Sequence, residues 1–449
     1  MSAQRWCRAA GAALALLLAA TAQAQVPATW PADPALPPAE LALPAIAALP
    51  EVQRKAAELD AARAAADMRA IGSSEARVTL IPQQRRVQDG PNYREWELDL
   101  DKSVRWPHKV ALDRRIGALG VEAAQLALED AHHAGARLLL QQWSDWLRAA
   151  ATTRSAQQQL ALLDEERVAL ARRVAAGDAA QRDLLAIDAA RAEADAARIE
   201  AELTEQAAQR TLRASFPALP IPQRAPLPVT VPELPGSAAS WRARILEVSQ
   251  EIGVARAQAE QQQALAERAR SERLPDPTLG VRVISELGGR EKLYGVVLGL
   301  PLGLRYRGAE AAQAAAQARV AQQDLNLMRR EVQLGAAQTV AAAQARHALW
   351  QARELAAQAA QQNLAKQRRA HVLSESGIAE LLQAARSAGT AEGSAARAAV
   401  DAIEALERVA VDAHARWHRH DEDEHQADAH APATSADALR LPTLGAPSV

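Results

Sequence analysis

The chain has 449 residues, with 52 Lys and Arg against 54 Asp and Glu, and it is 49% hydrophobic but only 3% aromatic. The near-neutral charge argues against a general nucleic-acid binder, since no strongly basic domain stands out. The scarcity of aromatic core residues and the abundance of Ala, Gln, Arg, Leu and Glu favour extended helices over a compact enzyme.

The N-terminus has the features of a secretory signal peptide. Arg5 and Arg8 precede the apolar run 9–20, and Ala22-Gln23-Ala24 forms a small-residue cleavage site. The run is shorter than the roughly 20 apolar residues that a membrane-spanning helix needs. We therefore expect the mature chain to start at Gln25 without Cys7, and so to have no thiol for a disulfide, a zinc site or a lipid anchor.

Two proline-rich stretches, 25–50 and 217–237, precede two similar halves of the chain. Trp106-Pro107 in the first half matches Leu300-Pro301 in the second, and Asp183-Leu184-Leu185 matches Glu380-Leu381-Leu382 at nearly the same separation. This spacing predicts a duplicated chain with a stiff connector. The predicted units are the signal peptide 1–24, an extended segment 25–50, a first repeat 51–216, a linker 217–237, a second repeat 238–412 and a flexible His- and acid-rich tail 413–449.

Each repeat is predicted to contain a helix, a β-hairpin and a long helical hairpin. The first helices are expected over 51–71 and 240–272, and alternating apolar residues then indicate strands around Trp96–Leu100, Leu279–Val283 and Val296–Leu300. Proline is absent between Pro107 and Pro217 and between Pro301 and Pro432, so very long helices can form there. A glycine beside a leucine pair interrupts each interval once, which predicts a hairpin turn.

The strand pattern, with carboxylates on one face and Trp or Leu on the other, suits the wall of a membrane barrel. Four strands cannot close a pore, and an open sheet edge in lipid leaves backbone groups unpaired. Several chains must then share one barrel, and three chains would give about twelve strands. The alternative is a pair of solvent-exposed coiled-coil hairpins with short accessory strands.

The order of elements resembles the TolC-like outer-membrane efflux proteins, with the heavy-metal efflux subgroup as one candidate. The match is most specific at Glu272–Val281 (ERLPDPTLGV), Gly299–Leu302 (GLPL) and Gly377–Leu382 (GIAELL). The resemblance implies a mainly α fold with a small β part: two tandem repeats of long helical hairpins plus β-hairpins. Three chains would form an outer-membrane β-barrel of about twelve strands, continued by a periplasmic α-helical barrel. It also implies a homotrimer that docks to a periplasmic adaptor (membrane fusion) protein and an inner-membrane efflux pump.

In that family the hairpin turns are the periplasmic tips that meet the adaptor. The candidate contact residues are Gly177, Leu184, Leu185, Gly377, Leu381 and Leu382. Simple packing within each hairpin is the alternative for the same residues. Charged groups near the tips could form ion pairs that hold the entrance shut, or a solvated face; they are Arg172, Arg173, Asp178, Asp183, Arg368, Arg369, Glu375 and Glu380.

The C-terminal region holds a cluster of histidines and acids. His414 and His418 are four residues apart, as in metal-binding pairs on a helix, and His420, His425 and His430 follow. Weak binding of Zn, Ni or Cu is one interpretation, and a flexible tail without a preformed site is the other. The sequence has no phosphate-binding glycine loop, no HExxH and no GxSxG, so we expect no enzyme activity and no cofactor.

These features together predict a passive outer-membrane channel that extends into the periplasm. It would conduct metal ions or small toxic compounds from a periplasmic adaptor and an inner-membrane pump to the exterior, in contact with outer-membrane lipid and not with nucleic acid. The histidine-rich tail favours metal ions slightly. The alternatives are a periplasmic coiled-coil adaptor of an export system and a periplasmic metal-binding protein.

Overall fold

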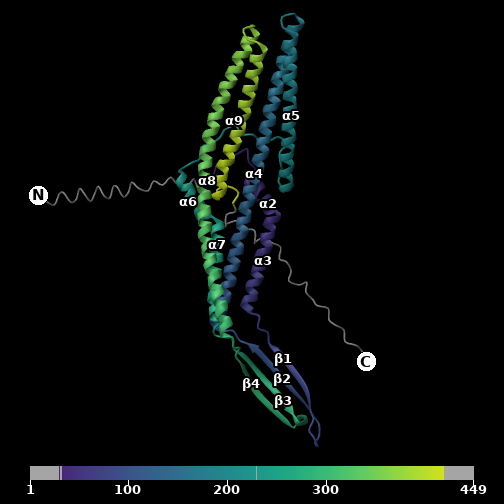
Figure 1. Cartoon of the computed structure of the whole chain (residues 1–449), viewed down its shortest axis with the longest axis vertical. Helices are drawn as coiled ribbons and strands as arrows, with labels where there is room; N and C mark the ends of the chain where they lie inside the picture. The colour runs from purple at the N-terminus through teal and green to yellow at the C-terminus, as the bar shows by residue number, and fades with distance from the viewer. Residues whose placement is uncertain (1–29, 31–32, 229, 419–449) are drawn as a thin grey trace, which may run out of the picture.

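The computed structural model describes residues 30, 33–228 and 230–418, and this part of the chain is mainly helical with one small sheet, as predicted (Figure 1). Corresponding helices of the two halves have equal lengths. They are α3 (Pro50–Ile71) and α7 (Gln250–Ser271) with 22 residues, α4 (Pro107–Ala175) and α8 (Leu304–Val372) with 69, and α5 (Gln181–Ser215) and α9 (Ile378–Asp412) with 35.

The two 69-residue helices give the molecule its elongated shape. At 1.5 Å per residue each is about 100 Å long. Figure 1 shows α5 and α9 folded back beside one half of them, α3 and α7 beside the other half, and the sheet beyond the end opposite the hairpin turns. Pro107 occupies the first turn of α4, where its missing N–H costs nothing. None of the described helices combines the length and hydropathy that crossing a bilayer requires.

The sheet is a four-stranded antiparallel meander that joins the two halves. Its strands are β1 (Arg77–Arg85), β2 (Tyr93–Ser103), β3 (Thr278–Glu286) and β4 (Glu291–Gly299), hydrogen-bonded in that order. β2 of the first half pairs with β3 of the second, although the helices α4 to α7 lie between them in the sequence. The outer edges of β1 and β4 have no partner strand within the described chain.

One face of the sheet is apolar and exposed. The register aligns two rows across all four strands, Val78, Leu100, Val281 and Val296 in one, and Leu80, Leu98, Val283 and Tyr294 in the other. Val296 is 84% exposed, so none of the described residues covers this face there. The alternation predicted from the sequence therefore places a continuous apolar surface on one side of the sheet.

The opposite face of the sheet is charged. Arg282 of β3 pairs with Glu97 at 2.9 Å and with Asp99 at 2.8 Å on β2. Arg85 of β1 pairs with the buried Glu95 at 2.9 Å. These cross-strand pairs compensate carboxylates that would otherwise repel one another along β2.

A buried ionic network connects the sheet to the helices. Lys109 in the first turn of α4 is 0% exposed, and its Nζ lies 3.0 Å from both Glu272 Oε2 and Asp276 Oδ1. Arg268 of α7 pairs with Asp113 of α4 at 2.9 Å and also with Glu272. The ends of α4 and α7 are therefore fixed to each other where the chain enters and leaves the strands.

The main hydrophobic core lies at mid-length, around Trp143, Trp146 and Phe216. Indole groups attach the proline-rich segments to this core and to a second cluster around Trp241. Trp143 donates to the Ala35 carbonyl at 2.7 Å, and Trp241 donates to the Pro235 carbonyl at 2.6 Å. Trp417 donates to the Pro37 carbonyl at 3.1 Å.

Three predictions about these connecting segments need correction. The segment 25–50 is not extended throughout, because α2 (Ala39–Ala47) forms there and buries Ala42, Ala45 and Ile46. The helix predicted over 240–272 is two helices, α6 (Ala238–Val248) and α7, separated at Ser249, whose hydroxyl accepts from the Ile252 N–H at 3.3 Å and caps α7. Residues 413–418, predicted to begin a flexible tail, are docked, because burial of Ala413 and Trp417 holds them on the core.

Candidate functional site at the hairpin turns

Both long hairpins turn through the same hydrogen-bond motif. After α4, the Asp178 N–H donates to the Arg173 carbonyl at 2.8 Å, and the Gly177 N–H to the Val174 carbonyl at 3.0 Å. After α8, the Glu375 and Ser374 N–H groups make the equivalent bonds at 2.8 and 3.1 Å. This pair of hydrogen bonds is a Schellman motif. It satisfies the last carbonyl groups of a helix and requires a residue with left-handed backbone conformation after the helix.

The left-handed residue is Gly177 in the first turn, with φ 79°, but Ser374 in the second, with φ 60°. The second turn lies at the predicted place beside Gly377, but Gly377 is not its left-handed residue. With φ −80° and ψ 168°, Gly377 is instead the extended residue that precedes α9. Position, and not residue type, aligns the two turns: Gly177 corresponds to Ser374, and Gly377 to Ala180, which precedes α5.

The two glycines should therefore respond differently to alanine. Gly177→Ala is expected to destabilise its turn by about 1–2 kcal/mol, because a Cβ disfavours the left-handed region. No atom lies within 4 Å of the new Cβ, so the cost is conformational. Hydrogen exchange at the Asp178 amide measures it. Gly377→Ala is the matched control and should be nearly neutral, since its Cβ meets only the movable carboxylate of Glu380. Equal effects at both positions would contradict this assignment.

The leucines near the turns have different surroundings. Leu381 and Leu382 of α9 are buried, in clusters that contain Leu364 of α8, and Leu163 and Ile187 of the first hairpin, respectively. Leu184 packs half-buried against the second of these clusters. Leu185 is 62% exposed. Packing between helices accounts for the three buried or half-buried leucines, and Leu185 presents an apolar side chain at the surface.

Arg173 links the two turns directly. Its Nε pairs with Asp178 at 3.0 Å in its own turn. Its Nη2 donates to Ser374 Oγ at 3.2 Å, and its Nη1 lies 3.4 Å from both the carbonyl oxygen and Nε2 of His371. Below it, Arg368 of α8 pairs with Glu166 of α4 at 2.6 Å and with Glu165 at 3.4 Å.

The predicted ion-pair residues thus divide into three groups. Arg173, Asp178 and Arg368 take part in the contacts within and between the hairpins. Asp183 lies 3.6 Å from its neighbour Arg182, which is almost fully exposed. The other four predicted residues form no ion pair with a described residue of this chain; they are Arg172, Arg369, Glu375 and Glu380.

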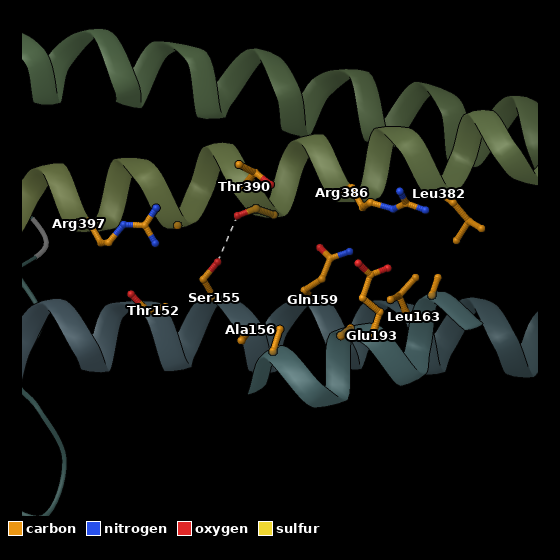
Figure 2. Close-up of a pocket in the computed structure, with 15 residues that line it drawn as sticks. Thr152, Ser155, Ala156, Gln159, Leu163, Glu193, Leu382, Arg386, Thr390 and Arg397 are labelled. Carbon is orange, nitrogen blue, oxygen red and sulfur yellow. Dashed lines mark hydrogen bonds between the residues drawn. The ribbon is translucent and has the colours of Figure 1, made fainter. Parts of the chain in front are cut away.

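Sequence reasoning missed the cleft between the two hairpins. Figure 2 shows Ser155 and Gln159 of α4 pointing towards α9 across a cleft of about 390 Å³ that Glu193 and Arg386 also line. The Ser155 hydroxyl donates to the Gly389 carbonyl at 3.2 Å. A Cβ at Gly389 would come within 2.3 Å of Gln159, so the absence of a side chain lets the hairpins approach here. The sequence signal that could have indicated this close approach is a pair of glycines four residues apart on a helix.

The histidine cluster is only partly described. His414 is the left-handed residue after α9, and its ring stacks on His418 with centroids 4.0 Å apart. His133 of α4, which sequence reasoning did not include, lies 5.3 Å from His414 by ring centroids. No three His, Cys, Asp or Glu side chains of the described ranges are arranged to hold a metal ion. His420, His425 and His430 lie outside the described residues.

Acidification should weaken the docking of residues 413–418. Burial and the nearby His418 and His133 lower the pKa of His414 to about 3, whereas the unfolded chain binds this proton near 6.5. Stability is therefore lost as the pH falls below about 6.5, and the loss reaches about 2 kcal/mol at pH 5. Asp412, whose pKa His133, Arg137 and Arg408 lower to about 2 against its burial, adds nothing until the pH falls below about 3.8.

Thermal unfolding at pH 7.5 and pH 5 measures this effect in the protein and in His414→Asn. Asparagine tolerates the left-handed backbone of this position and does not titrate. The variant should therefore lose less stability on acidification than the unmodified protein. Equal losses in both proteins would show that His414 does not carry the effect.

Comparison with known proteins identifies the fold. No protein-family model matches the sequence, and no curated protein matches it either. Among solved structures, the outer-membrane protein VceC from Vibrio cholerae has a TM-score of 0.70 at 17% identity, covering 83% of this chain and 95% of that one.

Two further structures are described as outer-membrane channels. Neisseria gonorrhoeae MtrE, in its open state, has a TM-score of 0.67 at 17% identity over 84% of this chain and 88% of its own. Campylobacter jejuni CmeC has 0.67 at 13% identity over 87% and 88%. The chain therefore has the fold of these outer-membrane channels, and the resemblance to TolC-like proteins is confirmed at the level of fold.

Proposed function

We propose that this protein is the outer-membrane channel of a tripartite efflux system. Three chains combine their sheets into one barrel of about twelve strands, and their long helices continue the conduit into the periplasm. The sequence contains no phosphate-binding glycine loop, so a partner pump supplies the energy. A periplasmic adaptor contacts the hairpin turns, with Leu185 as the exposed apolar anchor.

The sheet is the observation that carries this proposal. Its apolar face is continuous and uncovered, its other face is charged, and its two outer strands have unpaired edges. Exposed apolar surface and open edges are unfavourable in water, and open edges are more unfavourable still in lipid. Closure into a barrel with copies of the same sheet pairs the open edges. It also places the apolar face towards lipid and the charged face towards a water-filled bore.

The charged groups of the proposed conduit indicate the class of substrate. The acidic residues of β2 on the charged face and the histidines after α9 favour cations, metal ions among them, over anionic compounds. Small toxic compounds remain the second substrate class. Uptake of radioactive or fluorescent substrates of both classes, in cells with and without the protein, discriminates between them.

Membrane fractionation and bilayer recording test the channel itself. The protein should sediment with outer membranes, migrate as a trimer that heat dissociates, and give discrete conductance steps in planar bilayers. A water-soluble monomer without conductance would contradict the proposal. Export tested with and without residues 419–449, a deletion that leaves the docked Ala413 and Trp417 in place, then shows whether the remaining histidine-rich segment matters for transport.

A further inference from the structure

His371 lies between the two hairpin turns, and its two ring nitrogens have different partners. Nδ1 is 3.1 Å from the Ser376 carbonyl oxygen, and Nε2 is 3.4 Å from Nη1 of Arg173. A carbonyl oxygen only accepts hydrogen bonds, so Nδ1 must carry a proton. A guanidinium only donates, so Nε2 must present its lone pair. The arrangement therefore selects the neutral ring with its proton on Nδ1.

We propose that His371 makes the link between the two hairpin tips sensitive to protons, so that acidification releases Arg173 from the α8–α9 turn. As a regulation of the channel entrance, this inference rests on the proposed function. A proton on Nε2 replaces the acceptor by a donor and brings a second positive charge next to the permanently charged guanidinium. The hydrogen bond and the favourable electrostatics are lost in the same step.

Asp178 gives the released guanidinium another position. It already pairs with Nε of Arg173 at 3.0 Å and belongs to the α4–α5 turn. When His371 becomes charged, Arg173 is repelled from one turn and remains attracted to the other. The contacts from Arg173 to Ser374 Oγ and to the His371 carbonyl are then lost together with the ring contact.

The other charged groups near this end do not replace Arg173 as the partner of the ring. On α8, Arg368 is engaged by Glu165 and Glu166 of α4, and neither Arg369 nor Glu375 of the following turn forms an ion pair with a described residue. On α9, the Glu380 carboxylate lies over Gly377. Among the described residues, Arg173 is the charged group in hydrogen-bond contact with the His371 ring.

The release is confined to the tip. The cluster around Leu382, which extends to Val174 and Ile378 beside the turns, and the pairs of Arg368 continue to hold the hairpins together, and they contain no histidine. Protonation therefore releases the Arg173 link between the two turns without unfolding either hairpin, as a local opening at the tip.

Spin labels at Ala176 and Leu373 test this inference. Both positions are exposed and end the long helices, one in each turn, and Cys7 is the only native cysteine. In the protein without residues 1–24, the population with a longer label-to-label distance should rise several-fold when the buffer is changed from about pH 8 to about pH 5. His371→Gln should abolish the rise, because its amide oxygen accepts from Arg173 and does not titrate.

His347→Gln is the matched control. This histidine belongs to the same helix but packs against Trp350 far from the turns, so its replacement should leave the response intact. If His371→Gln does not fold, Arg173→Gln should give the long distance at both pH values. A constant distance in the unmodified protein, or a response that survives in His371→Gln, overturns the inference.

Bilayer conductance separates this result from the proposed function. A protein that conducts but whose tips do not respond to pH retains the channel function and refutes the proton-sensitive link. Tips that respond in a protein that never conducts support the link and contradict the channel.

Discussion

Val296→Arg is expected to abolish assembly in the outer membrane. Val296 lies in the middle of β4, 84% exposed, in the apolar row that contains Val281 and Leu100. If this face meets lipid, an arginine near the bilayer midplane costs about 2–4 kcal/mol in each chain. Heat-modifiable trimer in the outer-membrane fraction, detected by electrophoresis, should fall to background.

Val297→Arg is the matched control, one residue along the same strand. Its side chain projects to the charged face, in the cross-strand row that contains Asp101. A new arginine there meets carboxylates and water, so trimer yield should stay near that of the unmodified protein. If both variants assemble equally well, or if Val297→Arg is the worse of the two, the assignment of the faces is wrong.

Lys109→Met should produce the largest loss of stability within the helical part. The ammonium group is completely buried between Glu272 and Asp276, each 3.0 Å away. Methionine keeps most of the apolar stem but leaves two carboxylates without this partner, and breaking a buried pair costs about 3–5 kcal/mol. Arg268 still pairs with Glu272, so the lower end of this range is expected. Urea unfolding followed by circular dichroism measures the loss.

Lys55→Met serves as the comparison. Lys55 also forms an ion pair, with Glu58 at 2.9 Å, but on the exposed surface of α3. Exposed pairs contribute about 0–1 kcal/mol, so this variant should unfold close to the unmodified protein. Equal stability of the two variants would show that the junction between sheet and helices does not depend on the buried lysine.

Local patterns in the sequence were sufficient to predict the large elements. Alternation at Trp96–Leu100 identified a strand with two different faces, and the proline-free intervals identified the long helices, because both signals depend only on neighbouring residues. The same local reasoning failed in the proline-rich segments. Their order comes from distant partners, such as Trp143 donating to the carbonyl of Ala35, 108 residues away.

In the candidate site, too, neighbouring residues predicted some features, whereas others depend on distant contacts. A glycine near a leucine pair located both turns, yet the left-handed position of the second turn is occupied by Ser374. Residue type suggested Gly377, but hydrogen-bond geometry decides which position must be left-handed. The role of His371 could not be predicted either, since it depends on Arg173 of the other hairpin.

The docking of Trp417 onto Pro37 has a consequence for the order of folding. These residues are 380 positions apart, and Trp30 and Arg416 meet on the same carboxylate, Glu407. Contacts between such distant positions carry a high entropic cost of loop closure and form late. The mid-length core therefore cannot be completed until nearly the whole polypeptide has been synthesised. Until then, the helices that form earlier leave the part of the core that Trp417 covers exposed.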